Sequence, residues 1–176
     1  SLVMYLGNTK IGQLPPVLKF IDPYHGFWKN AELGSNTNGL VSEIESLHSE
    51  SEVVFDDRGV PHIFSDNLHD LYFLQGYLTA KDRLWQMEFQ THAAAGRLSE
   101  IIGEKALEFD LEQRRIGMSW AAEKSLEHIP EDTTSRQVLE AYTAGVNYYI
   151  THLSKDDYPL EYKLLDYSPE GWTPLK

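Results

Sequence analysis

Two neighbouring stretches decide the fold: VVFDDRGVPHIF at residues 53–64 and DLYFLQGYLTAKDRLWQMEFQ at residues 70–90. In the first, two runs of β-branched and aromatic residues flank a polar segment that ends in Gly59, a pattern typical of a hairpin with a long or bulged loop. Pro61 donates no backbone hydrogen bond, so it belongs at the start of a strand or at a sheet edge. We therefore predict a β-hairpin over residues 51–65.

The second stretch opens a region that we expect to be helical over about residues 66–153. Either Asp66 or Asn67 is placed to cap the first helix. One stripe of side chains then recurs with helical spacing, at Leu68, Leu71, Tyr72, Gln75 and Leu78. Gly76 lies within this helix and permits a close approach or a bend.

Glycines divide the rest of the helical region. The periodicity continues into the following segment, and Gly103 is expected to end it. A third helix is predicted over about residues 104–128, with Gly117 inside it. A fourth helix is predicted over about residues 131–153. Two side chains are placed to cap this last helix, Asp132 and Thr133.

The two ends of the chain differ from this helical middle. Glycine and proline recur too often in residues 1–50 for a long helix or a central strand, yet the segment carries aromatic side chains such as Phe20 and Trp28. We expect an irregular arm whose aromatic residues lie on another surface, of this domain or of a partner. Residues 154–176, which include Pro159, are expected to be extended and irregular. The predicted fold class is α+β, mainly helical with one hairpin.

The composition argues against several functional classes. The chain has 176 residues, and its 15 Lys and Arg against 27 Asp and Glu give a net charge of −12. Faces that bind nucleic acid or anionic lipid are basic, so neither partner is expected. No apolar run reaches the ~20 residues of a membrane helix, and no intact secretory signal opens the sequence. Without cysteine, the chain has no disulfide, thiolate metal site or cysteine nucleophile.

Histidines are the first candidates for acid–base or metal chemistry. Glu88 and His92 lie four residues apart and share a helix face, so they could form a metal pair or an acid–base pair. The alternative, which we favour because no third ligand is indicated nearby, is a buried hydrogen bond or a helix-stabilising ion pair. His62 could act as a general base. No nucleophile is identifiable beside His62, so we expect it to bond to the backbone.

Charged residues within the apolar helical run form a second candidate group. Charged side chains are seldom fully buried unless they are paired. We therefore expect a polar network in the core or at an interface, and a solvated face or direct contact with substrate are the alternatives. The residues concerned are Asp82, Arg83, Gln86, Glu88 and Arg97. The residues alone indicate an acidic α+β domain with no self-contained catalytic constellation.

Four motifs stand in a specific order and spacing, at residues 57–63, 70–77, 80–88 and 96–100. Together they resemble the start of the α chain in the penicillin acylase (penicillin amidase) family. The later Gly145-Val146-Asn147 and the Trp-x-Pro segment at residues 169–174 also fit, so the resemblance covers roughly residues 52–174. It implies an N-terminal-nucleophile hydrolase, whose αββα core of two stacked antiparallel sheets between helix layers receives the hairpin.

The resemblance also implies an activity and a partner. Precursors in this family are cut autocatalytically into a smaller α chain and a larger β chain. The N-terminal residue of the β chain, usually Ser, is the nucleophile, and its own α-amine is the base. This chain would then be the α-chain part of an amidohydrolase that splits an acyl amide into a carboxylic acid and an amine. Its expected partners are that β chain and a small-molecule amide, and its expected location is periplasmic or otherwise exported.

The resemblance assigns no catalytic, substrate-binding or metal residue to this chain. In the family, the α chain continues with a helix that lines the acyl pocket and offers a carboxylate to calcium, whereas this sequence stops at Lys176. Calcium is therefore expected only in the whole enzyme, and this chain alone is expected to be inactive. Ser1 precedes the α-chain motifs, which argues against it as the nucleophile. The alternatives are a non-catalytic binding or interaction module and a small enzyme that acts through His62 or the Glu88/His92 pair.

Overall fold

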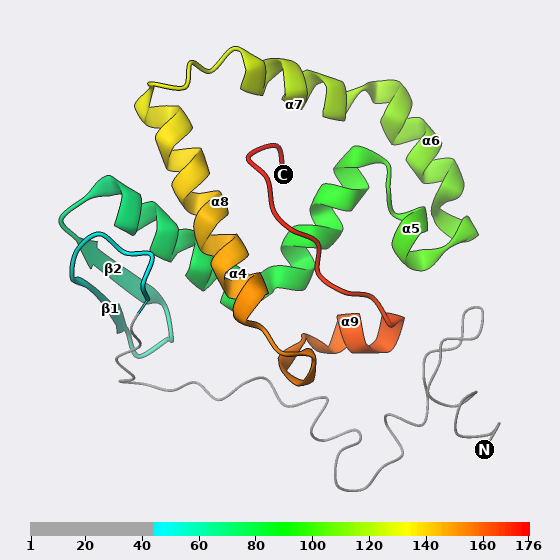
Figure 1. Ribbon diagram of the computed structural model, residues 1–176. Helices are drawn as coiled ribbons and strands as arrows, with labels where there is room; N and C mark the ends of the chain where they lie inside the picture. The colour runs from blue at the N-terminus through cyan, green and yellow to red at the C-terminus, as the bar shows by residue number, and fades with distance from the viewer. Residues whose placement is uncertain (1–43) are drawn as a thin grey trace, which may run out of the picture. The chain divides into compact units, whose positions relative to one another are not determined.

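A computed structural model describes residues 44–176, which are mostly helical with one two-stranded sheet (Figure 1). The predicted fold class, α+β with a hairpin, is therefore confirmed in this range. The elements in chain order are β1 (Ser51–Phe55), β2 (Pro61–Ser65), α4 (Leu68–Ala95), α5 (Ser99–Ile102), the short 3₁₀ turn η1 (Glu104–Ala106), α6 (Leu107–Ile116), α7 (Met118–Glu127), α8 (Thr134–His152), η2 (Lys155–Asp157) and α9 (Leu160–Leu165).

These elements divide into two compact units. The hairpin unit comprises residues 44–84, 120–152 and 171–176, and the α6 unit comprises residues 85–119 and 153–170. Helix α4 runs from one unit into the other. Its helical backbone is interrupted beside the boundary at Arg83, where φ is −144° and ψ is 37°.

The hairpin of the hairpin unit forms where the sequence predicts it. Strands β1 and β2 pair antiparallel, from Ser51 opposite Ser65 to Phe55 opposite Pro61. Asp56 shapes the loop, because its Oδ1 accepts hydrogen bonds from the backbone N–H groups of Arg58 and Val60 at 2.9 and 2.8 Å. Pro61 opens β2, a position that needs no hydrogen-bond donor.

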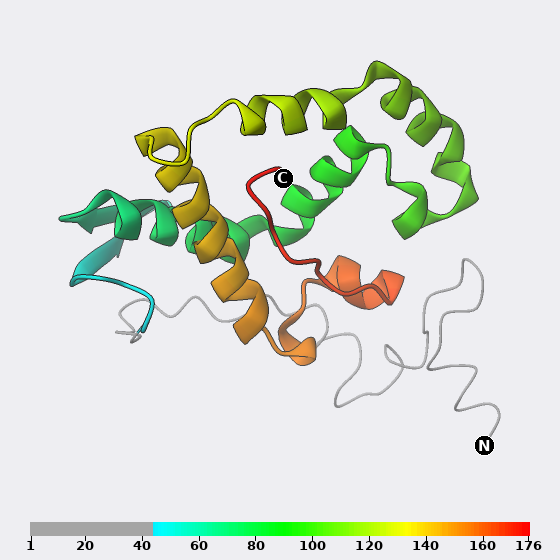
Figure 2. The ribbon, with the colours of Figure 1, turned by 45° about the horizontal axis from the view of Figure 1, so that its top comes forward.

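Helix α8 crosses the first half of α4 at a contact made by glycines (Figure 2). A Cβ at Gly145 would lie 2.8 Å from the Phe73 carbonyl carbon and 2.9 Å from the Tyr77 nitrogen. On the facing helix, a Cβ at Gly76 would lie 3.0 Å from the Tyr142 carbonyl carbon. The prediction that Gly76 permits a close approach is confirmed, and the backbones of the two helices touch here.

Local capping sets the starts of α4 and α8. Asn67 caps α4, because its Oδ1 accepts a hydrogen bond from the Asp70 N–H at 2.8 Å. Thr133 caps α8 through its Oγ1, 3.4 Å from the Arg136 nitrogen. Asn67 and Thr133 are each one of the two caps that the sequence offers, and α8 begins three residues later than expected.

Asn147 of α8 holds the last segment of the chain in the hairpin unit. Its Nδ2 donates to the Trp172 carbonyl at 2.9 Å, and its Oδ1 accepts from the Trp172 N–H at 2.7 Å. Trp172 is buried. One amide side chain thus satisfies both backbone groups of a residue that is 25 positions away.

We expect Asn147→Asp to release this segment. A carboxylate oxygen would replace the Nδ2 donor and face the Trp172 carbonyl, so we expect a loss of about 1.5 kcal/mol and about tenfold faster amide exchange at residues 171–176. Hydrogen–deuterium exchange with mass spectrometry measures it. The control is Thr151→Ala. The Thr151 side chain bonds only to residues of α8 itself. Unchanged exchange in Asn147→Asp would contradict the anchoring role.

Three sequence expectations are wrong, each for a local reason. The helical stretch expected to continue to Gly103 is interrupted after Ala95, because Gly96 takes a φ of +64° that ends α4. Gly103 does end the short helix α5, as expected. The helix expected over residues 104–128 is divided into α6 and α7, because Gly117 adopts a left-handed conformation and closes α6. The tail expected to be extended contains α9, which starts after Pro159.

Several expectations concern residues outside the described range. Most of the predicted arm, residues 1–50, and its aromatic residues lie there, as does Ser1. The division of the chain into an arm and a segment over residues 51–176 stays a prediction. Among the described residues, no helix combines the length and the apolar character needed to cross a bilayer.

Candidate functional site

The α6 unit contains a buried carboxylate, Glu88 of α4, which is 1% exposed. Its oxygens accept hydrogen bonds from the hydroxyl of Tyr162 on α9, the hydroxyl of Tyr167 at 3.1 Å and the backbone N–H of Glu170 at 3.0 Å. The ring of Trp85, one turn earlier on α4, packs edge-on against Tyr162 with ring centroids 5.0 Å apart. A single side chain of α4 thus fixes α9 and the segment that follows it.

His92 lies one turn further along α4, also 1% exposed. Its Nδ1 is 3.0 Å from the backbone carbonyl of Glu88, and its Nε2 is 3.4 Å from the Tyr167 hydroxyl and 3.8 Å from Glu170 Oε1. The buried hydrogen bond that we favoured for the Glu88/His92 pair is present, but it goes to the backbone of Glu88. We name the whole group the Glu88 hub: Glu88, His92, Tyr162, Tyr167 and Glu170.

Burial and hydrogen bonding shift the pKa values of two tyrosines in the hub and of Arg97 beside it. Burial raises the pKa of Tyr162 and Tyr167 well above the usual range, and the Glu88 carboxylate adds to this effect. Hydrogen bonds to Glu100 and Glu170 raise the pKa of the Arg97 guanidinium. The tyrosines therefore remain hydrogen-bond donors and Arg97 remains a cation at neutral pH. These two hydroxyl donors and the Arg97 cation thus hold the carboxylates of Glu88 and Glu170 in place.

Three side chains of the hub carry atoms of the kind that bind metal ions. One atom each of Glu88, His92 and Glu170 lies within 4.8 Å of the others. Both oxygens of Glu88 already accept hydrogen bonds, and both oxygens of Glu170 bind Arg97, at 2.7 and 3.2 Å. A cation would have to displace these donors, and calcium further requires six to eight oxygen ligands. In the described residues these carboxylates act as hydrogen-bond acceptors that anchor the segments around them.

A second buried carboxylate, Asp70, lies in the hairpin unit at the start of α4 and is fully buried. It accepts hydrogen bonds from the backbone N–H groups of His48 and Ser49 and from Asn67 Nδ2, at 2.8 to 3.0 Å. Its Oδ1 also lies 3.0 Å from His69 Nδ1. Burial alone would raise the pKa of Asp70, but these hydrogen bonds together outweigh it and hold the pKa well below its usual value.

We expect Asp70→Asn to destabilise the protein by about 3 kcal/mol at pH 7, because an amide cannot accept from all these donors. Unfolded Asp binds a proton near pH 3.9, whereas folded Asp70 binds one only at much lower pH. The contribution of Asp70 is therefore complete above about pH 4 and is lost as the pH falls toward the folded pKa.

Urea unfolding between pH 7 and pH 2.5 tests this expectation. The difference between wild type and Asp70→Asn should narrow below about pH 4. Asp57→Asn, at an exposed position of the hairpin loop, is the control and should change neither the stability nor its pH dependence. If the difference in unfolding free energy between wild type and Asp70→Asn stays constant with pH, the lowered pKa of Asp70 is contradicted.

Most of the remaining sequence candidates lie apart from the hub. Asp82 and Arg83 pair with each other at 2.7 Å on the surface, and Gln86 is exposed. These three residues therefore do not share a buried network with Glu88, because they are exposed within the described residues. A network at an interface stays a prediction. Arg97 does join the hub, through Glu170. His62 is exposed on the hairpin, with Nε2 3.6 Å from Asp56 Oδ2, so its side chain faces a carboxylate and not the backbone as expected.

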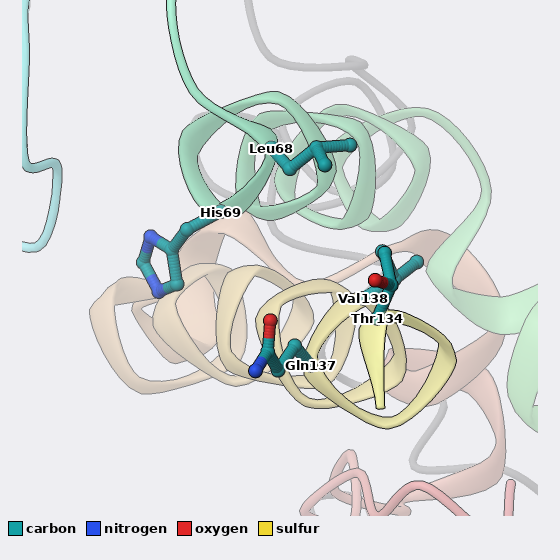
Figure 3. A pocket seen from close by; sticks show the side chains of 5 residues that line it. All are labelled: Leu68, His69, Thr134, Gln137 and Val138. Atoms are coloured by element: carbon teal, nitrogen blue, oxygen red, sulfur yellow. The ribbon is translucent and has the colours of Figure 1, made fainter. Parts of the chain in front are cut away.

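Figure 3 shows a pocket of the hairpin unit between the start of α4 and the start of α8. Five side chains line it: Leu68, His69, Thr134, Gln137 and Val138. The imidazole of His69 already contacts Asp70. Among the described residues, every buried side-chain nitrogen or oxygen has a hydrogen-bond partner.

Sequence reasoning missed Tyr162, Tyr167 and Glu170 as partners of Glu88. They lie 74 to 82 residues further along the chain, where the spacing of residues carries no information about contact. The one available signal was the crowding of tyrosines late in the sequence. The prediction that this chain holds no catalytic, substrate-binding or metal residue stays a prediction.

Comparisons with known proteins give a consistent result. The model of the penicillin amidase family matches residues 50–176. The penicillin acylase 2 proenzyme of Pseudomonas sp. (strain SE83) is 37% identical over 131 residues, which are 74% of this chain and 16% of that protein. The acyl-homoserine lactone acylase QuiP of Pseudomonas aeruginosa is 33% identical over 134 residues, which are 76% of this chain and 16% of that protein.

A solved structure agrees with the sequence relatives. The thermostable penicillin G acylase of Alcaligenes faecalis matches with a TM-score of 0.64 and 27% identity, over 72% of this chain and 67% of that chain. The chain thus shares a fold with an acylase, and it spans 16% of the length of the curated relatives named here.

Proposed function

Because the chain belongs to the penicillin amidase family, we propose that it is the N-terminal, α-chain part of an acyl amidohydrolase. The family match over residues 50–176 carries this proposal. Relatives named for penicillins and for acyl-homoserine lactones support the reaction class, because both kinds of compound present an acyl amide. The products are a carboxylic acid and an amine.

The nucleophile in this proposal is an N-terminal Ser of a separate, larger β chain. Its α-amine accepts the hydroxyl proton, the oxygen attacks the amide carbonyl, and the amine leaves with that proton. Backbone donors stabilise the oxyanion, and water then releases the acid from the ester. The term proenzyme in the name of the Pseudomonas relative supports a processed precursor. This chain alone is inactive in the proposal.

The exposed hairpin supports a larger assembly. Strands β1 and β2 pair only with each other among residues 44–176, and both Val54 and Phe64 are exposed. A two-stranded sheet with apolar faces in water is marginal by itself. We propose that the hairpin extends the αββα core of the whole enzyme. Export to the periplasm and a calcium ion held by other parts of the enzyme belong to the same proposal.

The test is to isolate the native protein under mild conditions and measure the intact mass of every chain that stays bound. We expect a much larger chain whose N-terminal residue is Ser, and hydrolysis by the complex of penicillin G, an acyl-homoserine lactone or an acyl p-nitroanilide. Replacing that Ser with Ala should abolish turnover and leave the assembly intact. A lone, folded 20.2 kDa species without amidase activity would overturn the proposal in favour of a binding module.

A further inference from the structure

Helix α6 is too short to be stable by itself. It spans ten residues, and isolated helices shorter than about 12–15 residues are marginal in water. Among the described residues of its unit, 85–119 and 153–170, hydrogen bonds hold α6 on one side. There the buried Asp110 accepts hydrogen bonds from the Leu98 and Ser99 N–H groups at 2.8 and 2.7 Å, and Arg114 Nε donates to the Gly96 carbonyl at 2.8 Å.

Two other sides of α6 are apolar and exposed. Leu107 and Leu111 form one stripe, Phe109 and Ile116 form another, and these side chains are between 44% and 60% exposed. With 3.6 residues per turn the two stripes lie roughly 170° apart around the helix axis. Side chains of the third sector, between the stripes and away from the Asp110 side, are polar and charged: Glu108, Glu112 and Arg115.

We propose that α6 is a two-sided wedge, inserted between two apolar surfaces of the larger part of the same enzyme. This inference rests on the proposed function, because the occupant is the rest of the amidohydrolase. The relatives are about six times longer than the matched region, which is 16% of their length, so they have ample chain to form both surfaces. A second copy of this chain fits less well, since a two-fold dimer covers a single patch on each subunit.

The wedge makes a specific prediction about solvent access in the assembled enzyme. Hydroxyl-radical footprinting of the wild-type complex should leave Phe109, Leu111 and Ile116 protected, while Leu175 of this chain, which is 39% exposed, serves as the reference side chain. Protection of both stripes supports the wedge. This measurement needs no substitution, so it does not depend on whether a variant folds.

Single cysteines give a sharper second measurement, because this chain has no cysteine of its own. We expect the thiols of Leu111→Cys and Ile116→Cys to react with maleimide at least about tenfold more slowly than the thiol of Glu112→Cys, since a buried thiol reacts only after local opening. Glu112 lies in the charged sector of the same helix and is the matched control. Intact mass of this chain reports the modification.

The outcomes separate the wedge from the proposed function. If the complex hydrolyses amides while either stripe is as reactive as position 112, the wedge is wrong and the proposed function stands. If both stripes are protected in a complex without amidase activity, the wedge stands and the proposed function is wrong. If the chain purifies alone with both stripes accessible, both are overturned.

Discussion

Gly145→Ala is expected to lower the free energy of unfolding by about 3 kcal/mol, the upper part of the range for overpacked cores. The new Cβ would lie 2.8 Å from the Phe73 carbonyl carbon and 2.9 Å from the Tyr77 nitrogen. These atoms belong to the backbone of α4, so they cannot rotate away as a side chain does. The two helices would have to separate along the whole crossing.

Helix propensity works in the opposite direction and makes the test stringent. Alanine is favoured over glycine within a helix by about 1 kcal/mol, so without the close contact Gly145→Ala would stabilise α8. Urea unfolding followed by circular dichroism measures the difference. Gly171→Ala is the control, because its Cβ would meet only Asn147 Oδ1 at 3.9 Å, and we expect a change within about 0.5 kcal/mol. Equal or increased stability of Gly145→Ala would contradict the contact.

The same crossing shows which contacts can be predicted from the sequence and which cannot. The presence of Gly76 in an apolar helical stripe predicts a close approach, and one is found. The identity of the facing segment, at Tyr142, could not be predicted because it lies 66 residues away and the periodicity of one helix does not select a partner. The hairpin, by contrast, was predictable in full, since its strands, loop and Pro61 all act within 15 residues.

Local conformation was less predictable where a glycine was compatible with two backbone conformations. Gly96 and Gly117 stand inside stretches with good helical spacing, and a glycine there either continues a helix at some cost or ends it at positive φ. Tertiary contacts decide for Gly96: a Cβ there would lie 2.5 Å from the Asp110 carbonyl oxygen. Helix α9 has six residues, too few for periodicity to show.

The polar residues of α4 show how far the members of a candidate site can be predicted from the sequence. The sequence identified Glu88 and Arg97 as members of a network, and the structure places both there. It also grouped Asp82 and Arg83 with them, because charge within an apolar run was the only criterion. The break of α4 at Arg83 turns this pair into solvent. What distinguishes Glu88 is the set of donors from α9 and residues 167–170, which only the folded chain brings together.

Glu88→Ala is expected to have the largest effect of any substitution in the hub, about 4 kcal/mol, because it leaves buried donors of Tyr162, Tyr167 and Glu170 without an acceptor. Glu88→Gln keeps the shape but turns an amide nitrogen toward some of these donors, and about 2 kcal/mol is expected. Urea unfolding measures both. Glu100→Gln is the control: Glu100 also pairs with Arg97 but is exposed, and such surface pairs contribute about 1 kcal/mol or less.

The pair of Glu88 variants also separates anchoring from catalysis. If Glu88 positions α9 and does not touch substrate, the folded fraction of Glu88→Gln in the assembled enzyme should turn over an acyl amide at close to the wild-type kcat, because the reacting atoms keep their surroundings. A stable Glu88→Gln enzyme with a large loss of kcat would place Glu88 at the substrate and overturn the anchor. Stability of Glu88→Ala equal to that of Glu100→Gln would overturn it as well. The donors that converge on Glu88 favour the first outcome, because both oxygens of its carboxylate already accept hydrogen bonds from this chain.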